Sequence, residues 1–194
     1  MSNLVERQGN GGFTYDDYCV WDDESGTRWE LIDGWAYAMA APTLTHQRIS
    51  RRLLKRFEDF LEGKICEVFA APCDVRLNFH KSDDTVVQPD LIVVCDPAKL
   101  ADGKSVKGAP DLVIEILSPS TRVHDKKIKL KQYCHAGVKE IWFVDPDTKG
   151  VDVILPGDST QPYVMYTCDE QIEVGVLPEL TIDLNDIFEQ EESQ

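Results

Sequence analysis

A strand–helix–strand pattern in the middle of the chain constrains the fold more than any other feature. Residues 111–117 and 140–144 are rich in Val, Ile and Leu, and residues 120–136 between them have apolar positions at helical spacing. A helix between two such strands predicts a right-handed crossover that makes the strands parallel neighbours. Their nearly continuous apolar character predicts a sheet that is covered on both faces.

Other segments extend this core into a mixed α+β arrangement. Residues 43–61 predict a long helix, because their apolar positions recur at helical spacing. The Asp33-Gly34 pair predicts a tight hairpin between strands at residues 29–33 and 35–40. We therefore expect an α/β fold, with a central mixed β-sheet flanked by helices and extra strands near both ends. Further elements are predicted as a short helix at residues 14–20 and strands at residues 66–70, 74–78, 86–94, 151–155, 163–167 and 172–174.

The length of 194 residues suits a single domain with a sizeable core. We expect a flexible N-terminus over residues 1–12, a single domain over residues 13–188 and an acidic tail over residues 189–194. The N-terminus carries charge and glycine and no apolar stretch, so no secretory signal is expected. No apolar run approaches the roughly 20 residues of a membrane span. The expectation is a cytoplasmic protein without a membrane partner.

The cysteines are spread along the chain without the spacing of a metal or redox motif. None forms a C-x-x-C pair, and none combines with histidine in a zinc-finger pattern. Reduced thiols are the expectation for a cytoplasmic protein, and a catalytic cysteine is the alternative. The six residues are Cys19, Cys66, Cys73, Cys95, Cys134 and Cys168.

The net charge of -15 argues against tight non-specific binding to DNA, because binding through phosphates usually requires a basic surface. It does not exclude local binding, since the field at a cleft depends on nearby charges. The predicted helix at residues 43–61 has one strongly basic face. That face is either simply solvated or contacts phosphates, and the candidate phosphate contacts on it are Arg48, Arg52 and Lys55.

Two carboxylates interrupt the apolar strands. Asp90 follows Pro89 within a β-rich run, where proline cannot donate to the ladder and indicates a bulge or an edge. Glu115 is a single charge in an apolar strand, and a buried carboxylate needs a cation, hydrogen bonds or a raised pKa. Asp90 has the alternative of a turn residue that bonds its own backbone. Glu115 has the alternative of an ion pair with a lysine of the following helix.

Two carboxylates on neighbouring strands could hold a hard cation such as Mg²⁺ (or Mn²⁺), which prefers oxygen ligands. The backbone carbonyl of Ile116 is a natural third ligand, because it lies beside Glu115. The helix that follows places Asp125 and Lys129 on one face, one turn apart, where they could pair. A lysine near the metal would stabilise negative charge in the transition state.

At this point the chain resembles the Uma family, restriction-endonuclease-like proteins of the PD-(D/E)XK nuclease superfamily. The resemblance covers residues 14–185 and implies that Asp90 and Glu115 are the superfamily's acidic pair. Leu117 stands where the motif has its lysine, so the resemblance implies that the following helix supplies it. The motifs are WELIDG (29–34), QPDLIVV (88–94), APDLVIEILSPST (109–121), D-x-x-x-K (125–129), Y-x-x-A-G-V (133–138) and WFVDP (142–146).

The resemblance also extends the site. Lys129 is implied as the catalytic lysine, with Asp125 before it, and the nearby Lys127 and Lys131 are the alternatives. Glu30 matches a third acidic position, which could equally be a surface residue of its strand. His46 and Gln47, at the start of the basic helix, could face the site as supporting residues.

The implied function is a Mg²⁺-dependent endonuclease that hydrolyses DNA phosphodiester bonds with a metal-activated water. One alternative is a catalytically weak or inactive nuclease-fold protein that acts in binding, because the charge of -15 disfavours DNA. Another is a phosphodiesterase acting on a different nucleic acid. A homodimer is expected, because two-fold symmetry matches a duplex cut on both strands. A light-scattering mass near that of one 21.9 kDa chain would exclude a stable dimer.

Overall fold

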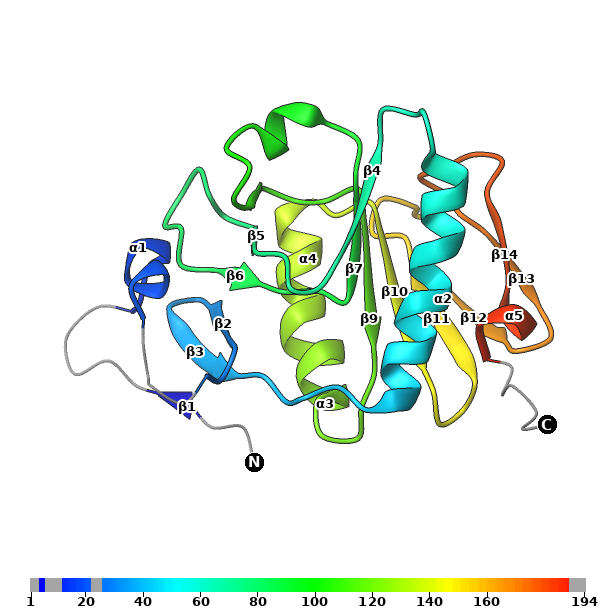
Figure 1. Ribbon diagram of the computed structural model, residues 1–194, viewed down its shortest axis with the longest axis horizontal. Coiled ribbons are helices and arrows are strands. Elements are labelled where there is room, and N and C mark those ends of the chain that lie inside the picture. The colour runs from blue at the N-terminus through cyan, green and yellow to red at the C-terminus, as the bar shows by residue number, and fades with distance from the viewer. Residues whose placement is uncertain (1–3, 6–11, 22–25, 189–194) are drawn as a thin grey trace.

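Figure 1 shows the computed structural model, which describes residues 4–5, 12–21 and 26–188. Its central sheet has the strand order β12-β11-β10-β9-β7-β4. β10 runs parallel to β9, and every other pairing in this sheet is antiparallel. The predicted parallel crossover and the mixed sheet are therefore confirmed. The bounds are β4 Glu67–Ala70, β7 Leu91–Val94, β9 Leu112–Ile116, β10 Glu140–Asp145, β11 Gly150–Ile154 and β12 Tyr163–Thr167.

Helices cover the two faces of the central sheet, as the continuous apolar strands predict (Figure 1). Helix α2 (Leu44–Leu61) packs Ile49, Leu53 and Phe57 against one face, together with Trp142 of β10. The other face is covered by the helix between β9 and β10, whose Tyr133 lies fully buried in a second apolar cluster. Thr43 accepts a hydrogen bond from the backbone N–H of His46 and so caps the beginning of α2.

The helix between β9 and β10 is less regular than its sequence predicts. It consists of α3 (Arg122–His124), a π-helical turn η2 (Asp125–Lys129) and α4 (Leu130–Ala136). The N–H of Leu130 donates to the carbonyl of Asp125, five residues back, which defines the wider turn. Gly137 ends the helix at a φ of 91°, a conformation that glycine adopts without strain.

A second sheet, here called the side sheet, has the strand order β1-β3-β2-β6-β5-β8. The predicted hairpin is present, with Asp33 and Gly34 at φ of 50° and 78° between β2 and β3. The prediction of one strand over residues 86–94 is wrong, because β6 belongs to the side sheet and β7 to the central sheet. The bounds are β1 Leu4–Val5, β2 Trp29–Ile32, β3 Trp35–Ala38, β5 Val75–Arg76, β6 Val86–Val87 and β8 Val106–Lys107.

The remaining elements are short. α1 lies where the sequence predicts a short helix, and it begins after a capping box formed by Thr14 and Asp17. β13 and β14 form a separate ribbon, and α5 follows it and packs on α2 (Figure 1). The sequence patterns do not reveal β8, β14, α5 or the 3₁₀ turn η1. The bounds are α1 Tyr15–Cys19, η1 Pro97–Leu100, β13 Gln171–Glu173, β14 Thr181–Asp183 and α5 Leu184–Phe188.

The expected flexible N-terminus and acidic tail lie almost entirely outside the described residues. The exceptions are Gly12 and β1, whose Leu4 and Val5 pair with β3. Within the described part of the chain, no helix combines the length and the apolar character needed to cross a membrane.

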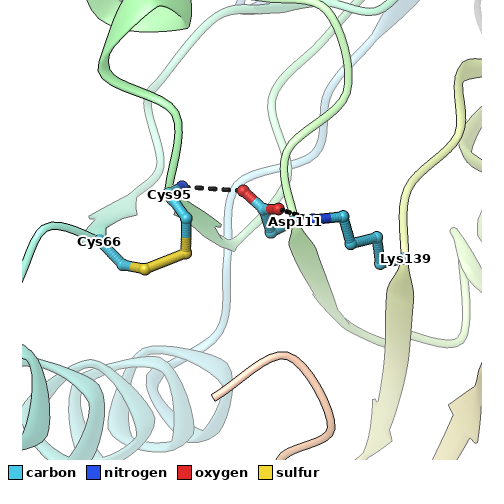
Figure 2. Close-up of a disulfide and its surroundings, with 4 residues drawn as sticks. All are labelled: Cys66, Cys95, Asp111 and Lys139. Atoms are coloured by element: carbon cyan, nitrogen blue, oxygen red, sulfur yellow. Dashed lines mark hydrogen bonds and ion pairs between the residues drawn. A yellow bond between two sulfur atoms is a disulfide. The ribbon is translucent and has the colours of Figure 1, made fainter.

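A disulfide joins Cys66 and Cys95 (Figure 2). Cys66 precedes β4 and Cys95 follows β7, so the antiparallel pairing of Glu67 with Val94 places the two cysteines opposite each other. The expectation of reduced thiols throughout is therefore wrong for this pair. Sequence spacing could not predict it, because 29 residues separate two cysteines that meet only through strand pairing.

Candidate functional site

Asp90 lies where the chain leaves the side sheet and enters the central sheet. Its Oδ2 accepts a hydrogen bond of 2.7 Å from the backbone N–H of Ile116 and contacts His46 Nε2 at 3.1 Å. Because a carboxylate oxygen only accepts, the histidine donates here. Asp90 therefore bonds the backbone of the neighbouring strand rather than its own, and half-buried Asp90 and His46 form the edge of the site.

Pro89 explains why the Ile116 backbone is available at this point. In the pairing of β7 with β9, Leu91 lies opposite Ile114. If this ladder continued for two more residues, Pro89 would lie opposite Ile116. Proline has no N–H, so the carbonyl of Ile116 loses its donor in the ladder. The carbonyl and N–H of one strand residue point to the same side, so this carbonyl faces the side of β9 on which Asp90 accepts the N–H. At Pro89, where the sequence indicates a bulge or an edge, the chain passes from the side sheet to the central sheet.

Glu115 lies in β9 with only 4% of its surface exposed. Its Oε1 accepts a hydrogen bond of 3.0 Å from Lys129 Nζ and another from the hydroxyl of Tyr133. The ion pair with a helix lysine, which the sequence left as an alternative for Glu115, is therefore present. Lys129 Nζ also lies 3.8 Å from Asp125 Oδ1, which confirms that these two residues share one face of the helix.

Glu30 reaches the same lysine from β2 in the side sheet. Its Oε1 lies 2.8 Å from Lys129 Nζ and accepts a 2.8 Å hydrogen bond from the backbone N–H of Gln88. Glu30 is only 4% exposed, so the alternative of a surface strand residue is wrong. Lys129 thus links a carboxylate of the side sheet to a carboxylate of the central sheet.

The buried groups around Lys129 carry more negative than positive charge. Burial lowers the pKa of Lys129, but Glu115, Glu30 and Asp125 outweigh this effect and hold it well above its ordinary value. Burial raises the pKa of Glu115 well above its ordinary value; Lys129 opposes this, while Asp125 and Asp90 add to it. Burial raises the pKa of Asp125 in the same way. Such a cluster is stabilised when it takes up a proton or a cation.

The free oxygens of the acidic pair fit a hard divalent cation. In each of the two carboxylates, one oxygen accepts two hydrogen bonds: Oδ2 in Asp90 and Oε1 in Glu115. The other oxygens, Asp90 Oδ1 and Glu115 Oε2, accept no hydrogen bond from the described residues. Together with the Ile116 carbonyl they offer three oxygens. The described residues contain no cage of three or more His, Cys, Asp or Glu side chains. Mg²⁺ does not need one, because it keeps several of its waters.

The remaining residues predicted to support the site or to contact phosphate differ in their exposure and in their contacts. Gln47 and Lys127 are exposed and contact none of the acidic residues described above. On α2, Arg48 is exposed, whereas Arg52 donates a 3.0 Å hydrogen bond to the carbonyl of Ile187. Lys55 pairs with Asp59, one helical turn away, at 2.8 Å. Contact of these basic residues with phosphate stays a prediction.

Sequence reasoning missed three residues beside the site. Tyr133 bonds Glu115, and its place one turn after Lys129 is a signal that could have indicated this. Gln88 holds Glu30 through its backbone N–H, and its own side-chain Oε1 is buried without a partner. The ring of His124 packs on Tyr37, and its pKa is lowered by burial. Only the tertiary structure reveals the roles of Gln88 and His124.

A cavity of about 770 Å³ lies at the opposite end of the parallel strands, away from this site. It is lined by Asp111 and Glu140, which stand at the amino ends of β9 and β10, and by Lys139. Glu115 and Ile116 stand at the carboxyl end of β9. The cavity and the cluster of Asp90 and Glu115 therefore lie at opposite ends of the central sheet.

Comparisons with known proteins agree with this architecture. The profile of the Uma2 family, described as "Putative restriction endonuclease", matches residues 14–185. The solved structure of "a putative nuclease belonging to DUF820 from Anabaena variabilis ATCC 29413" is similar with a TM-score of 0.71 and 21% identity, over 91% of this chain and 97% of that one. "Uncharacterized protein slr1290" of Synechocystis sp. (strain ATCC 27184 / PCC 6803 / Kazusa) is 34% identical over 122 residues, 62% of this chain and 61% of that protein.

The fold and the buried acidic site define a restriction-endonuclease-like protein, with a mixed central sheet between helices. The chain belongs to the Uma2 family, because the family profile matches nearly the whole domain. The Uma family resemblance seen in the sequence is therefore confirmed.

Proposed function

We propose that this protein is a Mg²⁺-dependent endonuclease that hydrolyses DNA phosphodiester bonds. One observation carries the proposal: Asp90, directly before β7, lies beside Glu115 of β9, and each presents an oxygen that accepts no hydrogen bond from the described residues. Asp90, Glu115 and the carbonyl of Ile116 would hold the ion. A divalent cation held there would supply Lewis-acid chemistry, polarising a phosphate and activating a water for attack at neutral pH.

The residues of the chain prepare the site in defined ways. Asp90 is fixed by the Ile116 N–H and by His46, so little ordering remains when it binds a ligand. Lys129 stays an ammonium, because the surrounding carboxylates raise its pKa. We assign it the role of offsetting negative charge that builds on the phosphate, with Glu30 and Asp125 holding it in place.

The test is Mg²⁺- or Mn²⁺-dependent nicking of plasmid DNA. Asp90→Asn and Glu115→Gln keep the shape of each side chain and remove its charge, and we expect each to lower the nicking rate about a hundredfold or more. Asp59→Ala, which removes an exposed carboxylate paired with Lys55, serves as the matched control and should cut like the wild type. Equal cleavage by all four proteins would exclude this site as the nuclease centre.

A non-catalytic binding protein is the second candidate function. The net charge of -15 favours it, and so does the engagement of Arg52 and Lys55 within the protein. Titration with Mn²⁺ by calorimetry separates the two functions. Micromolar-to-millimolar binding that Asp90→Asn abolishes supports the endonuclease, whereas no binding together with no cleavage supports the binding protein. Cleavage assays on RNA and on small phosphodiesters, run beside DNA, test whether the protein acts on a different substrate.

The homodimer stays a prediction.

A further inference from the structure

We propose that Tyr133 is a positioning residue for the metal site, which orients the Glu115 carboxylate by donating a hydrogen bond to its Oε1. This inference rests on the proposed function, since it concerns the same site. It adds a residue that does not itself touch the ion. Tyr133 is fully buried, lies in α4 and contacts Glu115 across the interface between the helix and β9.

The two oxygens of Glu115 have different surroundings. Oε1 accepts from both Lys129 Nζ and the Tyr133 hydroxyl, whereas Oε2 accepts no hydrogen bond from the described residues. A single donor would allow the carboxylate to rotate about its terminal bond, because that torsion is soft. Two donors from different positions on one oxygen fix the plane of the carboxylate. The Oε2 atom is thereby held in one orientation for a ligand.

The hydroxyl of Tyr133 can serve only as a donor in this position. A carboxylate oxygen only accepts hydrogen bonds, so the phenol O–H is the donor in its contact with Glu115 Oε1. Lys129, the other donor, is shared with Glu30 and Asp125, so Tyr133 is the donor that Glu115 does not share with another described carboxylate.

The π-helical turn explains how one helix presents these groups together. Asp125, Lys129 and Tyr133 follow one another at intervals of four residues. In an α-helix four residues exceed one turn of 3.6, so each step rotates forward around the axis. The wider turn of η2 needs more than four residues, so the step from Asp125 to Lys129 rotates backward. The backward rotation in η2 offsets the forward rotation in α4, so the side chains of Asp125, Lys129 and Tyr133 stay on the helix face that lies toward Glu115.

The first test is Mn²⁺ affinity, measured by calorimetry on the full chain. Tyr133→Phe removes only the hydroxyl, and we expect its dissociation constant for Mn²⁺ to rise about tenfold, as is usual when the partner of a metal ligand is lost. The matched control is Tyr163→Phe in β12, which removes a hydroxyl bonded to the Asp152 carboxylate of β11 and should bind like the wild type. A Tyr133→Phe protein with wild-type affinity would overturn the proposal.

A second readout keeps this test separate from the proposed function. In crystals of Tyr133→Phe we expect the Glu115 carboxylate to be rotated or disordered, with the melting temperature close to that of the wild type because the ring still packs. An unchanged Glu115 carboxylate would overturn the positioning role. If the wild type itself takes up no Mn²⁺, the proposed metal site fails, and the carboxylate orientation in the two crystals alone decides the role of Tyr133.

Discussion

Lys129 combines a structural and a chemical role in a single side chain. It is 4% exposed and lies within 3.0 Å of Glu30 and Glu115, which come from different sheets. Desolvating an ammonium is costly, so only the surrounding carboxylates make this position tenable. The same contacts hold the two acidic residues in place, and the stability of the fold and the geometry of the site therefore depend on one charge.

Replacing Lys129 by methionine should destabilise the protein. Removing one partner of a buried ion cluster leaves the other charges uncompensated, and we expect the free energy of unfolding to fall by about 3 kcal/mol at neutral pH. Urea unfolding measures the change. Lys127→Met is the control, because that lysine is exposed two residues away and its loss should matter by less than about 0.5 kcal/mol. Equal stability of both variants would show that the cluster contributes nothing.

At the scale of elements, the end of β10 is tied to the beginning of the helix over the site. Asp145 accepts hydrogen bonds from Arg122 of α3, one of them 2.9 Å long, and another from the backbone N–H of Asp147. Burial raises the pKa of the Asp145 carboxyl, but Arg122 and the Asp147 N–H outweigh this and hold it below its ordinary value. This link fixes the helix that carries Lys129 and Tyr133.

Asp145→Asn should therefore destabilise the protein in a pH-dependent way. A carboxyl with a lowered pKa in the folded state adds stability above its unfolded pKa of about 3.9, and this stability is lost as the pH falls through the folded value. We expect a loss of about 1.5 kcal/mol at pH 7 that shrinks as the pH falls below about 3.9 and vanishes once the pH is below the folded pKa, measured by urea unfolding over this pH range. Asp147→Asn, which touches the same Arg122 from an exposed position, should have a smaller effect. A difference in unfolding free energy between the wild type and Asp145→Asn that does not change with pH would contradict the stabilising role of the Asp145 carboxylate.

At the scale of the whole molecule, a covalent bond adds to the packing of the central sheet. The Cys66–Cys95 disulfide joins β4, the edge strand, to β7, which begins next to Asp90 (Figure 2). The backbone N–H of Cys95 also donates a 2.8 Å hydrogen bond to Asp111, whose other oxygen binds Lys139. These contacts hold together the end of the sheet that lies opposite the acidic site.

The double variant Cys66→Ser, Cys95→Ser should unfold more easily than the oxidised wild type. A crosslink that closes a loop of 29 residues restricts the unfolded chain, and we expect its loss to cost about 3 kcal/mol. Urea unfolding with and without dithiothreitol measures this, and reductant should lower the stability of the wild type but not that of the double variant. Cys19→Ser, at an exposed free cysteine, should stay reductant-sensitive like the wild type. A wild type indifferent to reductant would show that the bond is not formed in solution.

Much of the architecture follows from local patterns. The apolar periodicity of α2, the Asp33-Gly34 turn and the strand–helix–strand order all specify their structures directly, because each depends on neighbouring residues. The acidic pair could also be predicted, since a carboxylate such as Glu115 within an apolar strand has few stable environments. Pro89 marks the correct position for a break in the ladder.

Only the tertiary structure decided how these pieces meet. It separated β6 from β7, buried Glu30 beside Lys129, brought Tyr133 onto Glu115 and placed Cys66 opposite Cys95. The physical reason is the same in each case. These contacts join residues from different strands and helices, and their energies depend on burial and distance, which the order of residues along the chain does not contain. The sequence determined which residues could form the site, and the packing of two sheets and a helix determined how each of them is held.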